Sequence, residues 1–96
     1  MRERDVQRDV VAFYRKLGCF VYVLSQGRPT RQTPGLPDLY VQTHTSAWWH
    51  ESKTPAGKLR AAQVDFADRE MRAGGDVVVG GLSAAQTYAK ALGLVA

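Results

Sequence analysis

Hydrophobic residues in the first part of the chain recur at intervals of three and four, which is the spacing of one helical face. The pattern predicts an amphipathic helix over residues 3–17, ended by Gly18. Residues 19–24 are instead rich in β-branched and aromatic side chains and predict a strand. The prolines and glycines of residues 25–35 then predict a loop.

The middle of the chain predicts a β-hairpin. Two strand-like segments, residues 38–43 and 47–53, are separated by a short polar turn at residues 44–46. The second segment contains adjacent tryptophans, Trp48 and Trp49. Because side chains alternate between the faces of a strand, no more than one of these rings needs to be exposed or at an interface.

The remaining sequence predicts a helix, a strand and a helix. Residues 58–73 have helical spacing and are followed by two glycines, and residues 76–79 predict a short buried strand. Ser83 and Gln86 have the spacing of a capping box for the last helix. The side chains expected inside that helix are Tyr88, Ala91 and Leu92. The order α-β-β-β-α-β-α indicates a single α/β domain over residues 1–96.

The composition indicates the general class of protein but not its function. Thirteen Lys and Arg residues against nine Asp and Glu residues give a net charge of +4, which favours polyanionic partners. The one cysteine, Cys19, has no partner for an intrachain disulfide, as expected in a reducing cytoplasm. No stretch is apolar for long enough to span a membrane, and the charged first residues are unlike a signal peptide. We expect a soluble cytoplasmic protein.

The chemistry-bearing residues cluster in the hairpin. Asp38 follows Pro37, and Glu51 and Lys53 project from the same side of the next strand, while Ser52 leaves only its carbonyl nearby. Mg²⁺ prefers oxygen ligands and binds through one or two carboxylates plus water and substrate phosphate. A neighbouring lysine can orient the attacking water. The pattern favours metal-dependent phosphodiester hydrolysis.

Each of these residues also has a structural interpretation. An aspartate after proline is most often a turn residue, and Glu51 and Lys53 are also typical of a solvated strand edge. Gln63 alone is more often a surface amide of a helix. The conjunction of Asp38 with Glu51 and Lys53 favours the catalytic interpretation over these alternatives.

The motifs Gly35-Leu36-Pro37-Asp38-Leu39 and Glu51-Ser52-Lys53, followed by Gln63, resemble the PD-(D/E)XK nuclease superfamily. Within it they resemble the VRR-NUC family of virus-type replication and repair nucleases. A leading helix with Glu3 and Gln7 extends the resemblance over nearly the whole chain. Glu-x-Lys alone is common by chance, whereas its conjunction with G-x-P-D-L and a helical glutamine is much more specific.

The resemblance implies a restriction-endonuclease-like core, with a mixed central sheet flanked by helices, and a nuclease that uses Mg²⁺ or Mn²⁺. Asp38 and Glu51 would be the metal carboxylates, and the Ser52 carbonyl a further ligand. Lys53 would position the water and Gln63 would support the site. Glu3 is a candidate for completing the acidic cluster, although the first turn of a helix favours acidic residues for dipole reasons alone.

One departure from the family pattern is visible at Ser52, where such nucleases usually have an apolar residue. Because only the backbone of this residue is expected to reach the metal, we expect little effect on catalysis. We expect some effect on packing behind the strand.

The expected substrate is DNA. Basic residues near the proposed site predict a phosphate-binding rim, although each alone could be an ordinary surface base: Arg28, Arg31, Lys58 and Arg60. The chain resembles stand-alone phage-type members, which implies a homodimer that cuts branched DNA such as a four-way junction, in the host cytoplasm if phage-encoded. One of the two tryptophans, with Tyr88 and Leu92, is the expected interface. The alternatives are a DNA-binding module without catalysis and a small interaction protein with accidental motifs.

Overall fold

Helix α1 spans Glu3–Lys16 in the computed structural model, which describes residues 1–24 and 33–96. Its buried side chains, Val6, Val10 and Tyr14, follow one another every four residues, so one face of the helix packs on the core. Gly18 follows the helix with a φ of 87°, which glycine adopts without strain. The predicted first helix and its glycine end are confirmed.

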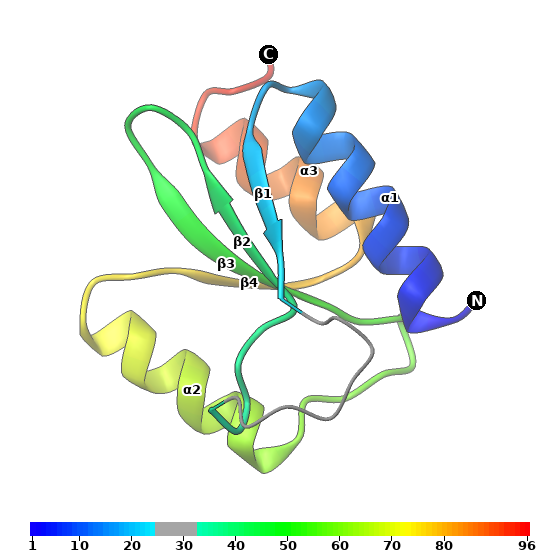
Figure 1. Cartoon of the computed structure of the whole chain (residues 1–96), viewed down its shortest axis with the longest axis vertical. Helices are drawn as coiled ribbons and strands as arrows, with labels where there is room; N and C mark the ends of the chain where they lie inside the picture. The colour runs from blue at the N-terminus through cyan, green and yellow to red at the C-terminus, as the bar shows by residue number, and fades with distance from the viewer. Residues whose placement is uncertain (25–32) are drawn as a thin grey trace.

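Within the described residues, four strands form one mixed sheet in the order β1-β2-β3-β4 (Figure 1). Strands β1 and β2 are antiparallel, β2 and β3 form the predicted antiparallel hairpin, and β3 and β4 are parallel. The bounds of the strands are Phe20–Val23 for β1, Leu39–Gln42 for β2, Ala47–Ser52 for β3 and Val77–Gly80 for β4. The predicted fold class and the order α-β-β-β-α-β-α are therefore confirmed.

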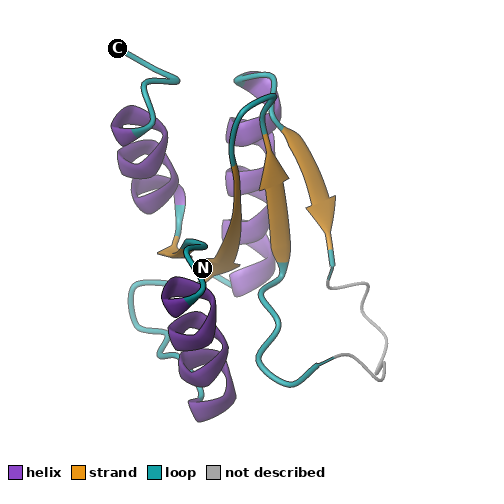
Figure 2. Cartoon of the chain, turned by 90° about the vertical axis from the view of Figure 1, so that its left-hand side faces the viewer, coloured by secondary structure: helices purple, strands orange, loops and turns teal. Residues whose placement is uncertain are grey.

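The helices lie on both faces of the sheet. Helix α1 and helix α3, Leu82–Ala91, pack on one face, whereas helix α2, Ala61–Arg72, lies on the other side near β4 (Figure 1). The main core lies between the sheet and the α1/α3 layer, and Trp48 is buried there at 1% exposure. The loop into β2 and the segment leaving β3 both lie at the lower end of the sheet in Figures 1 and 2. The residues of the G-x-P-D-L and E-x-K motifs meet at that end.

Helix α2 begins three residues later than its hydrophobic pattern predicts. Arg60 is extended, with φ −76° and ψ 161°, and its backbone N–H donates to Gln63 Oε1 at 2.8 Å. The Gln63 side chain thus accepts a hydrogen bond from a backbone N–H that has no partner within the helix. The same side-chain contact forms one of the two hydrogen bonds of a capping box. Residues 58–60 precede the helix instead of belonging to it.

The last two elements also differ from the sequence prediction. Gly81 is the N-cap of α3, so Ser83 already lies inside the helix and the predicted Ser83–Gln86 capping box is wrong. The buried residues of α3 are Ala85 and Ala89, because only small side chains fit where α3 packs against α1 and the sheet. Strand β4 is half-buried and not buried as predicted, since it is the edge of the sheet. None of the described helices has the length and apolarity to cross a membrane.

Candidate active site

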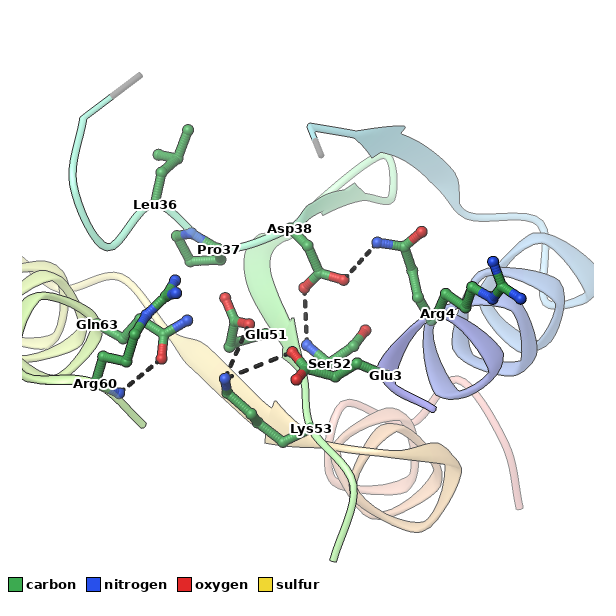
Figure 3. Close-up of a pocket in the computed structure, with 11 residues that line it drawn as sticks. Glu3, Arg4, Leu36, Pro37, Asp38, Glu51, Ser52, Lys53, Arg60 and Gln63 are labelled. Carbon is green, nitrogen blue, oxygen red and sulfur yellow. Dashed lines mark hydrogen bonds and ion pairs between the residues drawn. The ribbon is translucent and has the colours of Figure 1, made fainter. Parts of the chain in front are cut away.

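A pocket of about 520 Å³ lies at the lower end of the sheet, between the first turns of α1 and α2 (Figure 3). Side chains and backbone of residues far apart in the sequence converge on it. All of the predicted catalytic and metal-binding residues line this pocket: Asp38, Glu51, Ser52, Lys53, Gln63 and Glu3. The structure therefore brings together the residues that the motifs single out.

The Asp38 carboxylate is held by hydrogen bonds on both of its oxygens. Gln7 Nε2, from α1, donates to Oδ2 at 2.7 Å, and the Ser52 backbone N–H, from β3, donates to Oδ1 at 2.8 Å. Asp38 directly precedes β2, and the first residue of that strand, Leu39, pairs with His50 on β3. The carboxylate is thus fixed between a helix and a strand, opposite Glu51.

Glu51 is a buried acid, with 5% of its surface exposed. Burial, together with the negative charge of Asp38, raises its pKa from an ordinary value of 4.5 to about 7, while the positive charge of Lys53 opposes the shift. Without a cation, burial and the charge of Asp38 both disfavour the ionised form of Glu51, as its raised pKa indicates. The site therefore favours binding of positive charge.

The Lys53 ammonium lies between two carboxylates. Its Nζ is 3.5 Å from Glu3 Oε1 and 4.0 Å from Glu51 Oε2, and only 10% of its side chain is exposed. The backbone N–H of Lys53 donates to the Gly80 carbonyl at 3.3 Å, which extends the contact between β3 and β4 by one residue. Both the backbone and the ammonium group of Lys53 are therefore held in place.

Helical spacing places Glu3 on the same side of α1 as its apolar residues, but the structure does not bury it there. Its side chain is 53% exposed, because the first turn of α1 extends past the packed sheet and reaches Lys53 instead. No three His, Cys, Asp or Glu side chains form a metal-binding group within residues 1–24 and 33–96. In this structure the Glu3 carboxylate pairs with the Lys53 ammonium.

Gln63 is buried at the opposite wall of the pocket, with 6% of its surface exposed. Its amide oxygen accepts from the Arg60 N–H, so the amide nitrogen is oriented toward Glu51 (Figure 3). A surface amide would not be held in this way. The hydrogen bond that begins α2 also aims a donor into the site.

The predicted DNA-contacting residues are placed unevenly. Arg60 is exposed and lines the pocket, whereas Lys58 is exposed on the segment before α2 and does not line it. Arg28 and Arg31 lie outside the described residues. Arg4 is a pocket residue that the sequence prediction omitted, although its place beside Glu3 in the first turn of α1 is a signal that could have identified it.

A buried polar network lies behind the site strand. The Tyr14 hydroxyl and His50 Nδ1 are 2.8 Å apart, and His50 Nε2 is 3.0 Å from the Gly80 carbonyl oxygen. Since a carbonyl only accepts, Nε2 carries the proton and Nδ1 accepts from Tyr14. Burial lowers the pKa of His50, which favours this neutral form. No local sequence pattern indicates this network, because His50 is 36 residues from Tyr14 and 30 residues from Gly80.

Comparison with known proteins agrees with this fold and pocket. The chain matches no protein-family model and no curated protein. It is similar to a solved structure described as a VRR_NUC domain, with a TM-score of 0.68 and 30% sequence identity over 82% of this chain and 83% of that chain. Fold and likeness define a nuclease-type α/β domain. The chain belongs to the VRR_NUC family, as its motifs predict.

Proposed function

We propose that this domain is a DNA endonuclease that hydrolyses phosphodiester bonds with the help of Mg²⁺ or Mn²⁺. The observation that carries the proposal is the pairing of Asp38 with the buried Glu51, beside the Lys53 ammonium, in one open pocket. Membership of a nuclease-type family supports the same reaction class.

The donor set fits a small divalent cation. Asp38, just before β2, and Glu51, on the neighbouring strand β3, offer carboxylate oxygens. The Ser52 carbonyl is the proposed third protein ligand, and the pocket leaves room for water and phosphate. The raised pKa of Glu51 supports this fit, since a cation would offset the unfavourable second negative charge. Bound Mg²⁺ or Mn²⁺ would acidify a water and offset charge on the phosphate.

The remaining residues orient the reactants. Lys53 Nζ, held beside Glu51, is placed to position the attacking water. The Gln63 amide nitrogen, which is oriented toward Glu51, supports the site as a hydrogen-bond donor at the same point (Figure 3). Arg60 at the rim offers a guanidinium for a phosphate of the bound strand, with Lys58 further out on the same segment. Arg28 and Arg31 remain proposed DNA contacts.

The test is cleavage of branched and linear DNA in Mg²⁺, Mn²⁺ or EDTA. We expect cleavage only with a divalent cation, and loss of cleavage in Asp38→Asn, Glu51→Gln and Lys53→Ala with the fold retained by circular dichroism. Asp65→Asn, on the exposed face of α2, is the matched control and should keep full activity. Cleavage that persists undiminished in EDTA would contradict the metal mechanism. Salt-dependent DNA binding without cleavage would instead favour the non-catalytic DNA-binding module.

We further propose that the working unit is a homodimer that cuts branched DNA, with a four-way junction as the substrate. A domain with one candidate active site makes one cut, whereas resolving a junction requires two symmetric cuts on opposing strands. A two-fold dimer supplies both sites through one interface.

An aromatic stripe on the sheet face away from α1 and α3 supports this assembly. The stripe comprises Phe20, Tyr22, Tyr40 and Trp49, with ring centroids 4.8, 6.2 and 4.6 Å apart in turn. Phe20 and Tyr22 are 61% and 45% exposed, and α2 reaches only the Trp49 end, through Phe66. Exposed aromatic residues without charge are typical of interface cores.

The stripe also revises the expected interface. Tyr88 packs on Trp48, with the two ring centroids 5.0 Å apart, on the sheet face that α1 and α3 cover. Trp49 lies on the opposite face, so it does not share one surface with the last helix. We expect Tyr22→Glu to convert the dimer to a monomer in light scattering at micromolar concentration. Met71→Glu, at an exposed apolar residue of α2, should leave the mass unchanged. A wild-type monomer that still makes paired symmetric cuts in a junction would refute the dimer.

A further inference from the structure

Helix α1 contacts the candidate site at two points, one turn apart. Glu3 Oε1 lies 3.5 Å from Lys53 Nζ, and Gln7 Nε2 donates to Asp38 Oδ2 at 2.7 Å. Residues four apart lie on the same face of a helix, so one face presents both side chains to the pocket. Each of them contacts a different group of the proposed catalytic set.

The Gln7 contact determines how the Asp38 carboxylate is oriented. With the Ser52 N–H on Oδ1 and the Gln7 amide on Oδ2, rotation of the carboxylate would break one hydrogen bond or the other. A carboxylate has about four lone-pair positions, so two of them stay available for a cation. Gln7 therefore stands behind Asp38, in the position of a partner that orients a metal ligand.

The Glu3 contact acts on the other charged group. Among the described residues, the other charged partner of Lys53 is Glu51, at 4.0 Å. With Glu3 at 3.5 Å on the α1 side, the ammonium is held between two carboxylates and stays next to the place where a phosphate or water would bind. The Glu3 side chain is 53% exposed, so this ion pair orients Lys53 more than it stabilises the fold.

We propose that the first two turns of α1 form a positioning arm, in which Gln7 orients the Asp38 carboxylate and Glu3 orients the Lys53 ammonium, with neither residue binding the metal. The inference rests on the proposed nuclease function. It assigns a role to Gln7 and gives Glu3 a role other than that of metal ligand.

The two halves of the arm make different predictions about metal binding and turnover. Gln7→Met removes the amide donor at nearly constant size, so Mn²⁺ binding measured by calorimetry without DNA should weaken about 10- to 100-fold, the range typical of lost outer partners. Cleavage should return to the wild-type rate at saturating Mn²⁺. Gln86→Met, the same change on the exposed face of α3, should alter neither quantity.

Glu3→Gln removes the charge that holds Lys53. Its Mn²⁺ affinity should match that of the wild type, whereas cleavage at saturating Mn²⁺ should fall about 10- to 100-fold, because a misplaced group reduces turnover on that scale. Glu3→Asp keeps the charge on a shorter side chain and should recover part of the rate. Glu70→Gln, at the far end of α2, is the matched control and should behave as wild type.

Three results would overturn the arm. Weaker Mn²⁺ binding in Glu3→Gln, to the extent seen in Asp38→Asn, would make Glu3 a metal ligand. A Gln7→Met protein that has a lower unfolding temperature but unchanged Mn²⁺ affinity would make Gln7 merely structural. Wild-type protein that binds no Mn²⁺ would refute the proposed function itself, and the arm with it.

Discussion

Gly35 lies directly against Ala62 in the first turn of α2, so close that a Cβ on Gly35 would collide with the Ala62 carbonyl group. Gly35 also has a φ of 81°, in the region that favours glycine. This contact explains in physical terms why a glycine begins the G-x-P-D-L motif. The tight approach sets where Pro37 and Asp38 lie relative to Gln63.

Gly35→Ala should therefore destabilise the protein. Left-handed backbone strain alone costs on the order of 1 kcal/mol, and the collision with backbone adds to it. Gly74→Ala is the matched control, because its φ of 91° carries the same strain but a Cβ there meets nothing within 4 Å. Urea unfolding of both variants separates the two contributions, and equal losses would show that the contact with α2 does not matter.

Ser52→Ala should stabilise the protein without reducing its activity. Ser52 is 2% exposed, and its hydroxyl is buried without a hydrogen-bond partner among the described residues. An unsatisfied buried hydroxyl costs about 1–3 kcal/mol, whereas the Ser52 backbone groups, which bind Asp38 and the proposed metal, are kept in alanine. Thermal unfolding should show the gain, and Ser83→Ala on exposed α3 should show none.

Glu51 should make the metal-free protein less stable as the pH rises. Its pKa is about 7 in the folded state against 4.5 ordinarily, so folding takes up a proton between these values. The stability that this provides is complete below pH 4.5 and is lost as the pH rises through 7. The difference of about 2.5 pKa units corresponds to on the order of 3 kcal/mol.

Glu51→Gln has no carboxyl group that takes up a proton on folding, so it should be more stable than wild type at pH 8 in EDTA. The difference in the free energy of unfolding between the two proteins should shrink toward pH 5. Unfolding curves across this pH range provide the measurement. Addition of Mg²⁺ at pH 8 should raise the unfolding temperature of the wild type and leave that of the variant unchanged. A wild-type curve parallel to that of Glu51→Gln would place Glu51 in an ordinary solvated setting.

Tyr14→Phe should cost about 1–3 kcal/mol of stability, because it leaves His50 Nδ1 buried without a donor. The ring itself is retained, so its edge contacts with Trp48 and His50 are preserved. Tyr40→Phe, on the half-buried aromatic stripe, is the matched control and should change stability by less than about 0.5 kcal/mol. Similar losses in the two variants would argue against the buried network.

Much of the fold follows from patterns that depend on one element at a time. The four-residue repeat of Val6, Val10 and Tyr14 predicts α1, and strand alternation predicts that Trp48 and Trp49 lie on opposite faces of β3. The carboxylates of the site were predictable only from the conjunction of Asp38 with Glu51 and Lys53, since each of these residues alone also has a structural interpretation.

Contacts between elements could not be predicted in this way. A helical wheel places Glu3 on the core side because it assumes that the core continues under every turn, whereas the sheet ends before the first turn of α1. The start of α2 depends on Gln63 binding the Arg60 N–H, which overrides the apolar pattern of residues 58–60. His50 is positioned by Tyr14 and Gly80, and no local pattern relates residues so far apart.

The Gly80 carbonyl accepts hydrogen bonds from both His50 Nε2 and the Lys53 N–H. The strand that bears Glu51 is therefore secured by a residue that the ribosome adds 27 positions after Lys53. A nascent chain that has emerged only through α2 contains every side chain of the pocket but lacks the strand that holds them in place. The pocket therefore reaches its observed geometry only once β4 has been added.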